Sequence, residues 1–362
     1  MLVHVIFFVL GLAALVAGAE ALVRGASKLA LSVGVSSLVV GLTIVAFGTS
    51  APEVAVSVGA VLNGTTDIAV GNVVGSNIFN VLFILGASAL VAPLVVHSQI
   101  IRQEVPIMIG ASLLLLVVLL DGRLGRADAG LLLGLLAGYT VYLVRQSRAE
   151  TKEIRDEYAA GVHRDGGWDR HWAVQVLLIL AGLVLLVLGS GWLVDAAVAF
   201  ARALGVSDLV IGLTIIAAGT SMPELAASIT AAVRGERDIA VGNVIGSNTF
   251  NILGCLGISG LVSRDGLSIA PAVLNFDLWV MVAVAVACLP VFIAGREIGR
   301  GKGLLFVGYY IAYVAYLILG AQDHDALDEY SAIMIGFVLP ITIVTLVAML
   351  IRNQHKQGRA SG

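Results

Sequence analysis

Two short segments carry oxygen-bearing side chains at a spacing that suits cation binding. In AFGTSAPE, residues 46–53, the hydroxyls of Thr49 and Ser50 precede Glu53, which follows Thr49 by about one helical turn. In GNVVGSNIFN, residues 71–80, Ser76 and Asn80 stand four residues apart and so share one face of a helix. A hydroxyl, an amide carbonyl and a carboxylate are all hard donors, the type that Ca²⁺ and Na⁺ accept.

A proline and a glycine interrupt the first segment. Pro52 removes a backbone donor and Gly48 relaxes the chain, so the carbonyls from Ala46 to Thr49 are expected to lose their helical partners. In a bilayer, a carbonyl without a partner is unfavourable unless it lines a cavity or binds another group. A cation is such a group, so the backbone at Ala46 is a further candidate ligand.

Residues 40–80 recur as residues 211–251 at a constant offset of 171, with 26 identities in 41 positions and no gap. Every acidic residue of the first copy is retained in the second. Paired interruptions of hydrophobic helices in two halves of a chain are typical of a transporter's binding site. The second copy supplies Ala217, Thr220, Ser221, Glu224, Ser247 and Asn251.

The donor set favours calcium and sodium over transition metals. Neither copy contains His or Cys, which argues against zinc, copper and iron. Calcium takes about six to eight oxygens in adaptable geometry, whereas magnesium dehydrates reluctantly. A structural role remains open for the hydroxyls, which bond helix carbonyls elsewhere. The asparagines that flank the candidate ligands are expected to serve helix–helix contacts or freed backbone groups: Asn72, Asn77, Asn243 and Asn248.

Composition defines the class of protein. The chain is 59% hydrophobic and only 12% charged, its mean hydropathy is +1.00, and apolar runs of about 20 residues recur, the length that spans a bilayer as helix. The net charge of −3 favours no nucleic-acid partner, and no obligate protein partner is evident. Cys255 and Cys288 lie in apolar runs and are expected to be buried thiols. The first apolar run lacks a basic segment before it and is interpreted as a retained helix rather than a signal peptide.

The hydropathy pattern predicts an all-α polytopic membrane protein of about 11 spans. The predicted helices cover residues 2–22, 37–62, 69–92, 103–120, 127–146, 173–195, 208–233, 240–262, 273–294, 303–320 and 331–351. The first five and the next five correspond, and the eleventh has no counterpart. A repeat of five spans crosses the membrane an odd number of times, so the second copy is inverted. The predicted divisions are a first repeat (1–146), a solvated cytoplasmic linker (147–172), a second repeat (173–320) and an extra helix (331–351).

The distribution of Lys and Arg predicts the orientation. With the N-terminus outside, 17 of the 21 basic residues lie inside. The linker and the C-terminus are then cytoplasmic, and the acidic loop at 321–330 lies outside. Glu104 and Asp277, near helix starts, are expected at the membrane interface.

GTSAPE with GNVVGSNIFN, and GTSMPE with GNVIGSNTFN, resemble the two α-repeats of the cation/calcium exchanger superfamily, most closely its prokaryotic sodium/calcium exchangers. The resemblance covers essentially residues 1–320. It implies counter-transport of calcium against sodium by alternating access, with the first and sixth helices sliding past the rest. By position it implies these ion ligands, the first four as metal ligands: Glu53, Glu224, Thr49, Thr220, Ser50, Ser221, Ser76, Ser247, Asn80 and Asn251, with the carbonyls of Ala46 and Ala217.

Asn251 departs from several relatives, which have an aspartate there, and this favours transport without potassium. The sequence leaves a proton/calcium exchanger and, more remotely, a cation channel open. An intramembrane hydrolase is disfavoured, and the chain is not expected to be an enzyme, because all six histidines lie outside both repeats and no Ser–His pair is evident.

Overall fold

A computed structural model describes residues 2–149, 171–206, 208–211, 214–215, 217–322, 324–345 and 347. In this part of the chain, nine helices are long and apolar enough to cross a membrane, and the bent pair Ser37–Thr49 and Ala51–Leu62 makes a tenth. The predicted span 208–233 consists of the short helices α11 (Asp208–Ile211), α12 (Ala217–Gly219) and α13 (Met222–Val233). The chain is therefore a multi-pass, all-α membrane protein, as the sequence predicts.

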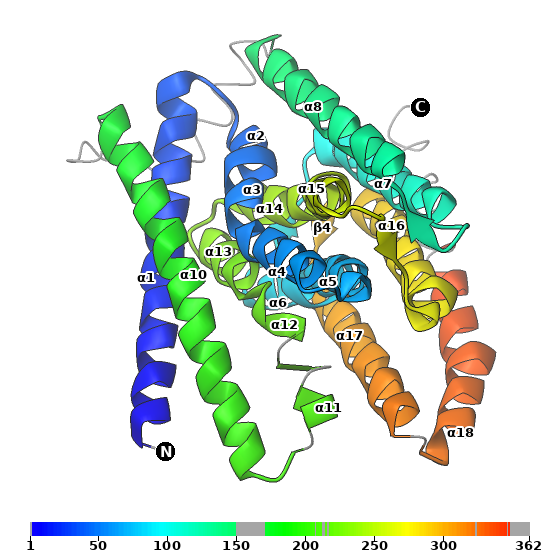
Figure 1. The fold of residues 1–362 in the computed structure, drawn as a ribbon. Coiled ribbons are helices and arrows are strands. Elements are labelled where there is room, and N and C mark those ends of the chain that lie inside the picture. Colours follow the sequence, from blue (N-terminus) through cyan, green and yellow to red (C-terminus); the bar gives the residue numbers. More distant parts are fainter. Residues whose placement is uncertain are drawn as a thin grey trace.

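Two long helices, α1 (Leu2–Val33) and α10 (Trp172–Ala203), lie side by side at one edge of the molecule (Figure 1). Their backbones approach closely at glycines: a Cβ on Gly18 would lie 2.8 Å from the carbonyl oxygen of Gly182. Both helices extend beyond the predicted 2–22 and 173–195. The apolar run ends at the first charged residues, but a helix satisfies its own backbone hydrogen bonds and can continue past them.

The first broken helix comprises α2 (Ser37–Val40), η1 (Gly41–Val45), α3 (Ala46–Thr49) and α4 (Ala51–Leu62). The axis bends by 41° at Ser50. Pro52 lies in the first turn of α4, and Pro223 occupies the same place in α13. A proline is tolerated there because the first turn of a helix has no acceptor for its backbone N–H.

The next helix of each half changes from α-helical to π-helical hydrogen bonding at one residue. In the first half, α5 (Thr66–Phe79) continues as the π-helical segment η2 (Asn80–Leu85) and then α6 (Gly86–Val91). In the second half, α14 (Arg237–Phe250) continues as η6 (Asn251–Cys255) and α15 (Leu256–Val262). Single π-turns within α-helices are frequent at functional sites. Both begin at a candidate ligand, Asn80 or Asn251.

The remaining described helices lie on the side of this centre away from α1 and α10 (Figure 1). They are η3 (Ile100–Glu104), α7 (Val105–Val118), α8 (Arg126–Ala149), η7 (Val273–Asp277), α16 (Leu278–Ile293), α17 (Arg300–Ala321), α18 (Ala326–Ile333) and η8 (Met334–Val338). Two antiparallel strand pairs, which the sequence pattern did not indicate, join loops of opposite halves. In one, β1 (Leu94–Val95) pairs with β4 (Glu297–Ile298); in the other, β2 (Arg123–Leu124) pairs with β3 (Leu267–Ser268).

The structure adds to one expectation and confirms another. Glu104, expected at the membrane interface, is fully buried by neighbouring helices, and its Oε2 accepts a hydrogen bond from the Tyr139 hydroxyl at 2.7 Å. Its depth in the bilayer stays a prediction. Cys255 and Cys288 are buried free thiols, as predicted. Helix α18, which begins the predicted eleventh span, contacts α17: the Tyr330 hydroxyl donates to the carbonyl of Ala312 at 2.8 Å.

Candidate ion-binding site

The two broken helices bring Glu53 and Glu224 together through crossed hydrogen bonds. Ser50 Oγ donates to Glu224 Oε1 at 2.9 Å, and Ser221 Oγ donates to Glu53 Oε1 at 2.9 Å. All four residues are fully buried. Among the described residues, neither carboxylate has an ion-pair partner. Each repeat therefore supplies one carboxylate and the hydroxyl that orients the carboxylate of the other repeat.

Several candidate ligand oxygens are buried without a hydrogen-bond partner in the described part of the chain. They are Glu53 Oε2, Glu224 Oε2, Ser76 Oγ, Asn80 Oδ1 and Asn251 Oδ1. Buried polar atoms are nearly always hydrogen-bonded in folded proteins. The glutamate and asparagine oxygens occupy corresponding positions of the two repeats, and with Ser76 Oγ they form a set of hard donors suited to a cation.

Asn72 and Asn243 each donate hydrogen bonds to the glutamate-bearing helix of their own half. The Nδ2 of Asn72 donates to the carbonyl of Glu53 at 3.3 Å and to Ser57 Oγ at 3.1 Å. In the second half, Asn243 donates to the carbonyl of Glu224 at 3.3 Å and to Ser228 Oγ at 2.9 Å. These bonds confirm that the two asparagines serve helix–helix contacts, since the carbonyls of Glu53 and Glu224 lie within α4 and α13. Sequence reasoning missed the two serines, although both copies share them at corresponding positions.

The helices that carry Asn80 and Asn251 cross through a second set of amide contacts. Asn77 Nδ2 donates to the carbonyl of Asn248 at 3.4 Å, and Asn248 Nδ2 donates to the carbonyl of Asn77 at 3.2 Å. Asn80 Nδ2 bonds Asn248 Oδ1, and Asn251 Nδ2 bonds Asn77 Oδ1, at 3.0 and 3.3 Å. The amide nitrogens of Asn80 and Asn251 are thus occupied, and their unpartnered carbonyl oxygens remain for a ligand.

The threonines and the backbone positions differ between the halves. Thr49 is fully buried and donates to Asn243 Oδ1 at 3.2 Å, whereas Thr220 is half-buried and lies 3.5 Å from Asn72 Oδ1. The carbonyl of Ala46, expected to lose its helical partner, accepts from Ser50 N at 3.1 Å. A carbonyl oxygen has two lone pairs, so it can keep this bond and accept another, as it does from Ser247 Oγ at 3.5 Å. Ala217 begins α12, and the structure describes only its backbone.

The two sides of the site differ in exposure. Gly242, Asn243 and Gly246 on α14 are buried, and a Cβ on Gly246 would lie 2.7 Å from the carbonyl oxygen of Leu42. Their counterparts on α5, residues 71, 72 and 75, are only half-buried. The α2–α3 segment therefore closes one side against α14, while the α5 side is more open.

Comparison with known proteins places these features in a family. The profile of the family described as sodium/calcium exchanger protein matches residues 3–145 and 174–319. The putative antiporter CaxA of Alkalimonas amylolytica is 41% identical over 89% of this chain and 100% of its own. The inner membrane protein YrbG of Escherichia coli is 39% identical over 88% of this chain and 97% of its own. The solved structure of the sodium-calcium exchanger NCX_Mj, soaked with Na⁺ and Ca²⁺, superposes with a TM-score of 0.74 at 30% identity, covering 87% of this chain and 98% of that one.

The contribution of Asn243 to stability can be compared with that of its counterpart in the first repeat, Asn72. Asn243→Ala leaves the carbonyl of Glu224 and the hydroxyl of Ser228 without their shared donor in a fully buried position. We expect it to lower the free energy of unfolding by about 1–3 kcal/mol. Asn72→Ala should have a smaller effect, because Asn72 is half-buried. Reversible unfolding in mixed detergent micelles measures both; equal losses would contradict the asymmetry of the two sides.

Proposed function

The chain belongs to the sodium/calcium exchanger protein family, and we propose that it exchanges sodium for calcium across the cell membrane as a secondary antiporter. The observation that carries this proposal is the pair of buried carboxylates, Glu53 and Glu224, each with one unpartnered oxygen. A soaked exchanger structure with the same fold supports calcium and sodium as the transported ions.

The proposed site uses the charges of both repeats for one ion at a time. Two carboxylates neutralise one Ca²⁺, and the surrounding oxygens complete the coordination that a hard cation requires. Without a cation, two like charges face each other in a region of low dielectric, which is unfavourable. Calcium or several sodium ions relieve this and permit the site to close. The proposed ligands are those predicted from the sequence: Glu53, Glu224, Thr49, Thr220, Ser50, Ser221, Ser76, Ser247, Asn80 and Asn251, with the carbonyls of Ala46 and Ala217.

The unequal exposure of the two sides supports alternating access. In the orientation predicted from the sequence, with the N-terminus outside and the C-terminus in the cytoplasm, the more open α5 side faces outward. Since the repeats are inverted, exchanging their conformations would close that side and open the α14 side. An inward sodium gradient would then drive calcium out of the cell.

The coupling ion is proposed from the donor set. Sodium accepts hydroxyl and carbonyl oxygens, which are the majority here, whereas a proton requires only the carboxylates. Asn251 contributes an amide rather than a carboxylate, so the site has no third negative charge to hold potassium beside calcium. We therefore propose sodium coupling without potassium, with proton coupling as the alternative.

A transport assay separates these alternatives. Purified protein in sodium-loaded vesicles should take up calcium-45 when an outward sodium gradient is imposed, with potassium replaced by choline on both sides and the voltage clamped. Uptake driven by a pH gradient in sodium-free vesicles would instead support the proton exchanger. A requirement for potassium would show that Asn251 does not set the ion selectivity.

The carboxylate pair has a matched control in Glu104. Glu53→Gln or Glu224→Gln should each reduce calcium exchange by roughly 30-fold to several thousandfold, because removing one partner of a buried charge pair costs roughly 2–5 kcal/mol. Glu104→Gln changes an equally buried carboxylate that bonds Tyr139 away from the site, and exchange should persist. Calcium affinity by isothermal calorimetry gives a second readout; wild-type affinity in Glu53→Gln would refute the assignment.

An ion pair on one side of the molecule favours the described conformation. Arg234, after α13, pairs with Glu20 on α1, and its Nε lies 2.7 Å from Glu20 Oε2. Helix α1 packs along α13, whereas the repeat-related helices α10 and α4 touch little. The positions that correspond to Glu20 and Arg234 are Gly191 and Asn63, which cannot form an ion pair. Exchanging the two conformations would therefore lose this contact without replacing it.

Breaking the pair should shift the population toward the other conformation. An exposed ion pair contributes up to about 1 kcal/mol, so Glu20→Gln or Arg234→Gln should raise the minor conformation roughly two- to fivefold. The reporter is thiol labelling of Leu38→Cys, which is buried against α14 here, in detergent and with Cys255 and Cys288 replaced by alanine. The exchanged pair Glu20→Arg with Arg234→Glu should restore slow labelling. Unchanged labelling in both single variants would contradict this role.

A further inference from the structure

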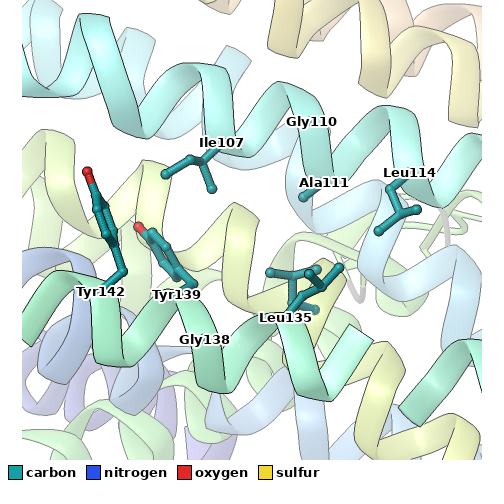
Figure 2. Close-up of a pocket in the computed structure, with 9 residues that line it drawn as sticks. Ile107, Gly110, Ala111, Leu114, Leu135, Gly138, Tyr139 and Tyr142 are labelled. Atoms are coloured by element: carbon teal, nitrogen blue, oxygen red, sulfur yellow. The ribbon is translucent and has the colours of Figure 1, made fainter. Parts of the chain in front are cut away.

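A groove between α7 and α8 lies outside the ion site. Its volume is about 420 Å³, and its walls are apolar (Figure 2). Ile107, Gly110 and Leu114 line it from α7, Leu135 and Gly138 from α8, and Leu253 from η6. The volume falls within the roughly 300–1,000 Å³ typical of ligand pockets.

The groove faces the bilayer. Large apolar side chains of both helices around it are exposed, among them Leu113, Val117 and Leu131, and in a membrane protein such side chains contact lipid. From residue 107 to 114 the groove follows α7 for about 10 Å at 1.5 Å per residue. It therefore has the length and the polarity for part of one acyl chain.

One end of the groove is polar. The hydroxyl of Tyr142, which lines the groove, donates to Gln103 Oε1 at 3.1 Å, and Gln146 Nε2 donates to the same oxygen at 2.6 Å. Gln146 Oε1 is buried and has no hydrogen-bond partner in the described part of the chain. An unpaired buried acceptor is unfavourable, so a hydroxyl donor from a bound molecule would stabilise this end.

Positive charge flanks the polar end. Arg102 precedes Gln103, Arg145 precedes Gln146, and both arginines are exposed. In the orientation predicted from the sequence this end lies at the cytoplasmic surface, where basic residues beside a transmembrane helix attract anionic lipids. The charge and the acceptor together suit a headgroup that carries a phosphate and hydroxyls.

The second half of the molecule lacks this arrangement. Phe276 is the fourth residue of η7, as Gln103 is of η3, so it occupies the place of Gln103 in the second half. Its ring packs on Tyr316 with the centroids 4.3 Å apart. The extra helix contacts α17, the counterpart of α8, through Tyr330. The polar end is therefore particular to the first half and does not follow from the shared repeat.

We propose that this groove binds an anionic phospholipid of the cytoplasmic leaflet, with one acyl chain between α7 and α8 and the headgroup at Gln103, Gln146 and the two arginines. Leu253 lines the groove and belongs to η6, the segment that begins at the proposed ion ligand Asn251. The bound chain packs against the segment that presents this proposed ion ligand.

Native mass spectrometry of the purified full chain tests the proposal, using equal amounts of phosphatidylglycerol and phosphatidylcholine in detergent. The wild-type protein should retain phosphatidylglycerol preferentially. Gly138→Leu should lose most of the retained lipid, because its side chain fills the groove. Gly308→Leu makes the same change at an exposed glycine of α17, where a Cβ also meets open space, and should retain lipid as the wild type does.

The charge requirement has its own control, Arg126, on the helix that carries Arg145. Arg102→Gln and Arg145→Gln should each lower the preference for phosphatidylglycerol roughly fivefold, whereas Arg126→Gln, at the opposite end of α8, should leave it unchanged. If Gly138→Leu retains as much phosphatidylglycerol as the wild type, the groove is not the lipid site. If the wild type retains both lipids equally, the headgroup assignment is wrong. If Gly138→Leu does not fold, as judged by its melting temperature, Gly110→Leu fills the groove from the opposite helix and decides the question.

Discussion

The structure is organised around two like-charged carboxylates held inside a membrane protein without a basic partner among the described residues. An ionised carboxylate in such a position is unfavourable by several kcal/mol unless other groups stabilise it. The crossed serine bonds at 2.9 Å provide one stabilising donor to each carboxylate, and the second oxygen of each remains for a cation. The helix breaks, the π-helical segments η2 and η6 and the asparagines of α5 and α14 lie around this pair. In the function that we propose, the transported ion compensates the charge of this polar centre.

The inverted repeat gives this centre an approximate symmetry, but the two halves are packed differently and so are buried to different extents. Asn72 and Asn243 make the same bonds to their own broken helices, yet only Asn243 is fully buried. The difference arises because the α2–α3 segment packs closely on α14, where Gly246 allows the backbones to meet. One amino-acid pattern therefore exists in two environments within a single chain.

The sequence was sufficient to predict the span pattern, the broken helices and the identities of the clustered side chains. The i, i+4 spacing and the proline at Pro52 are local features, and local features are readable from one segment. It could not show that Ser50 bonds Glu224 rather than Glu53, because spacing within a repeat does not determine contacts between repeats. The burial of Glu104 was missed for a similar reason, since the covering residue, Tyr139, lies on another helix. The strand pairs were missed because two-residue strands leave no periodic pattern.

The crossed bonds also limit which parts of the molecule can move. A motion that separated α4 from α13 would remove both serine donors from the buried carboxylates at once, so these helices are constrained to stay together while an ion is bound. The strand pairs β1–β4 and β2–β3 further join the two halves outside the site. Helices α1 and α10 instead pack mainly on each other through glycines, and their polar contacts with the broken helices and adjoining turns include Glu20 to Arg234, Ser27 to Glu236 and Ser190 to the carbonyl of Gly219. Such contacts are individually weak. For the exchange that we propose, this packing favours α1 and α10 as the helices that shift, since their close glycine contacts would let them move together.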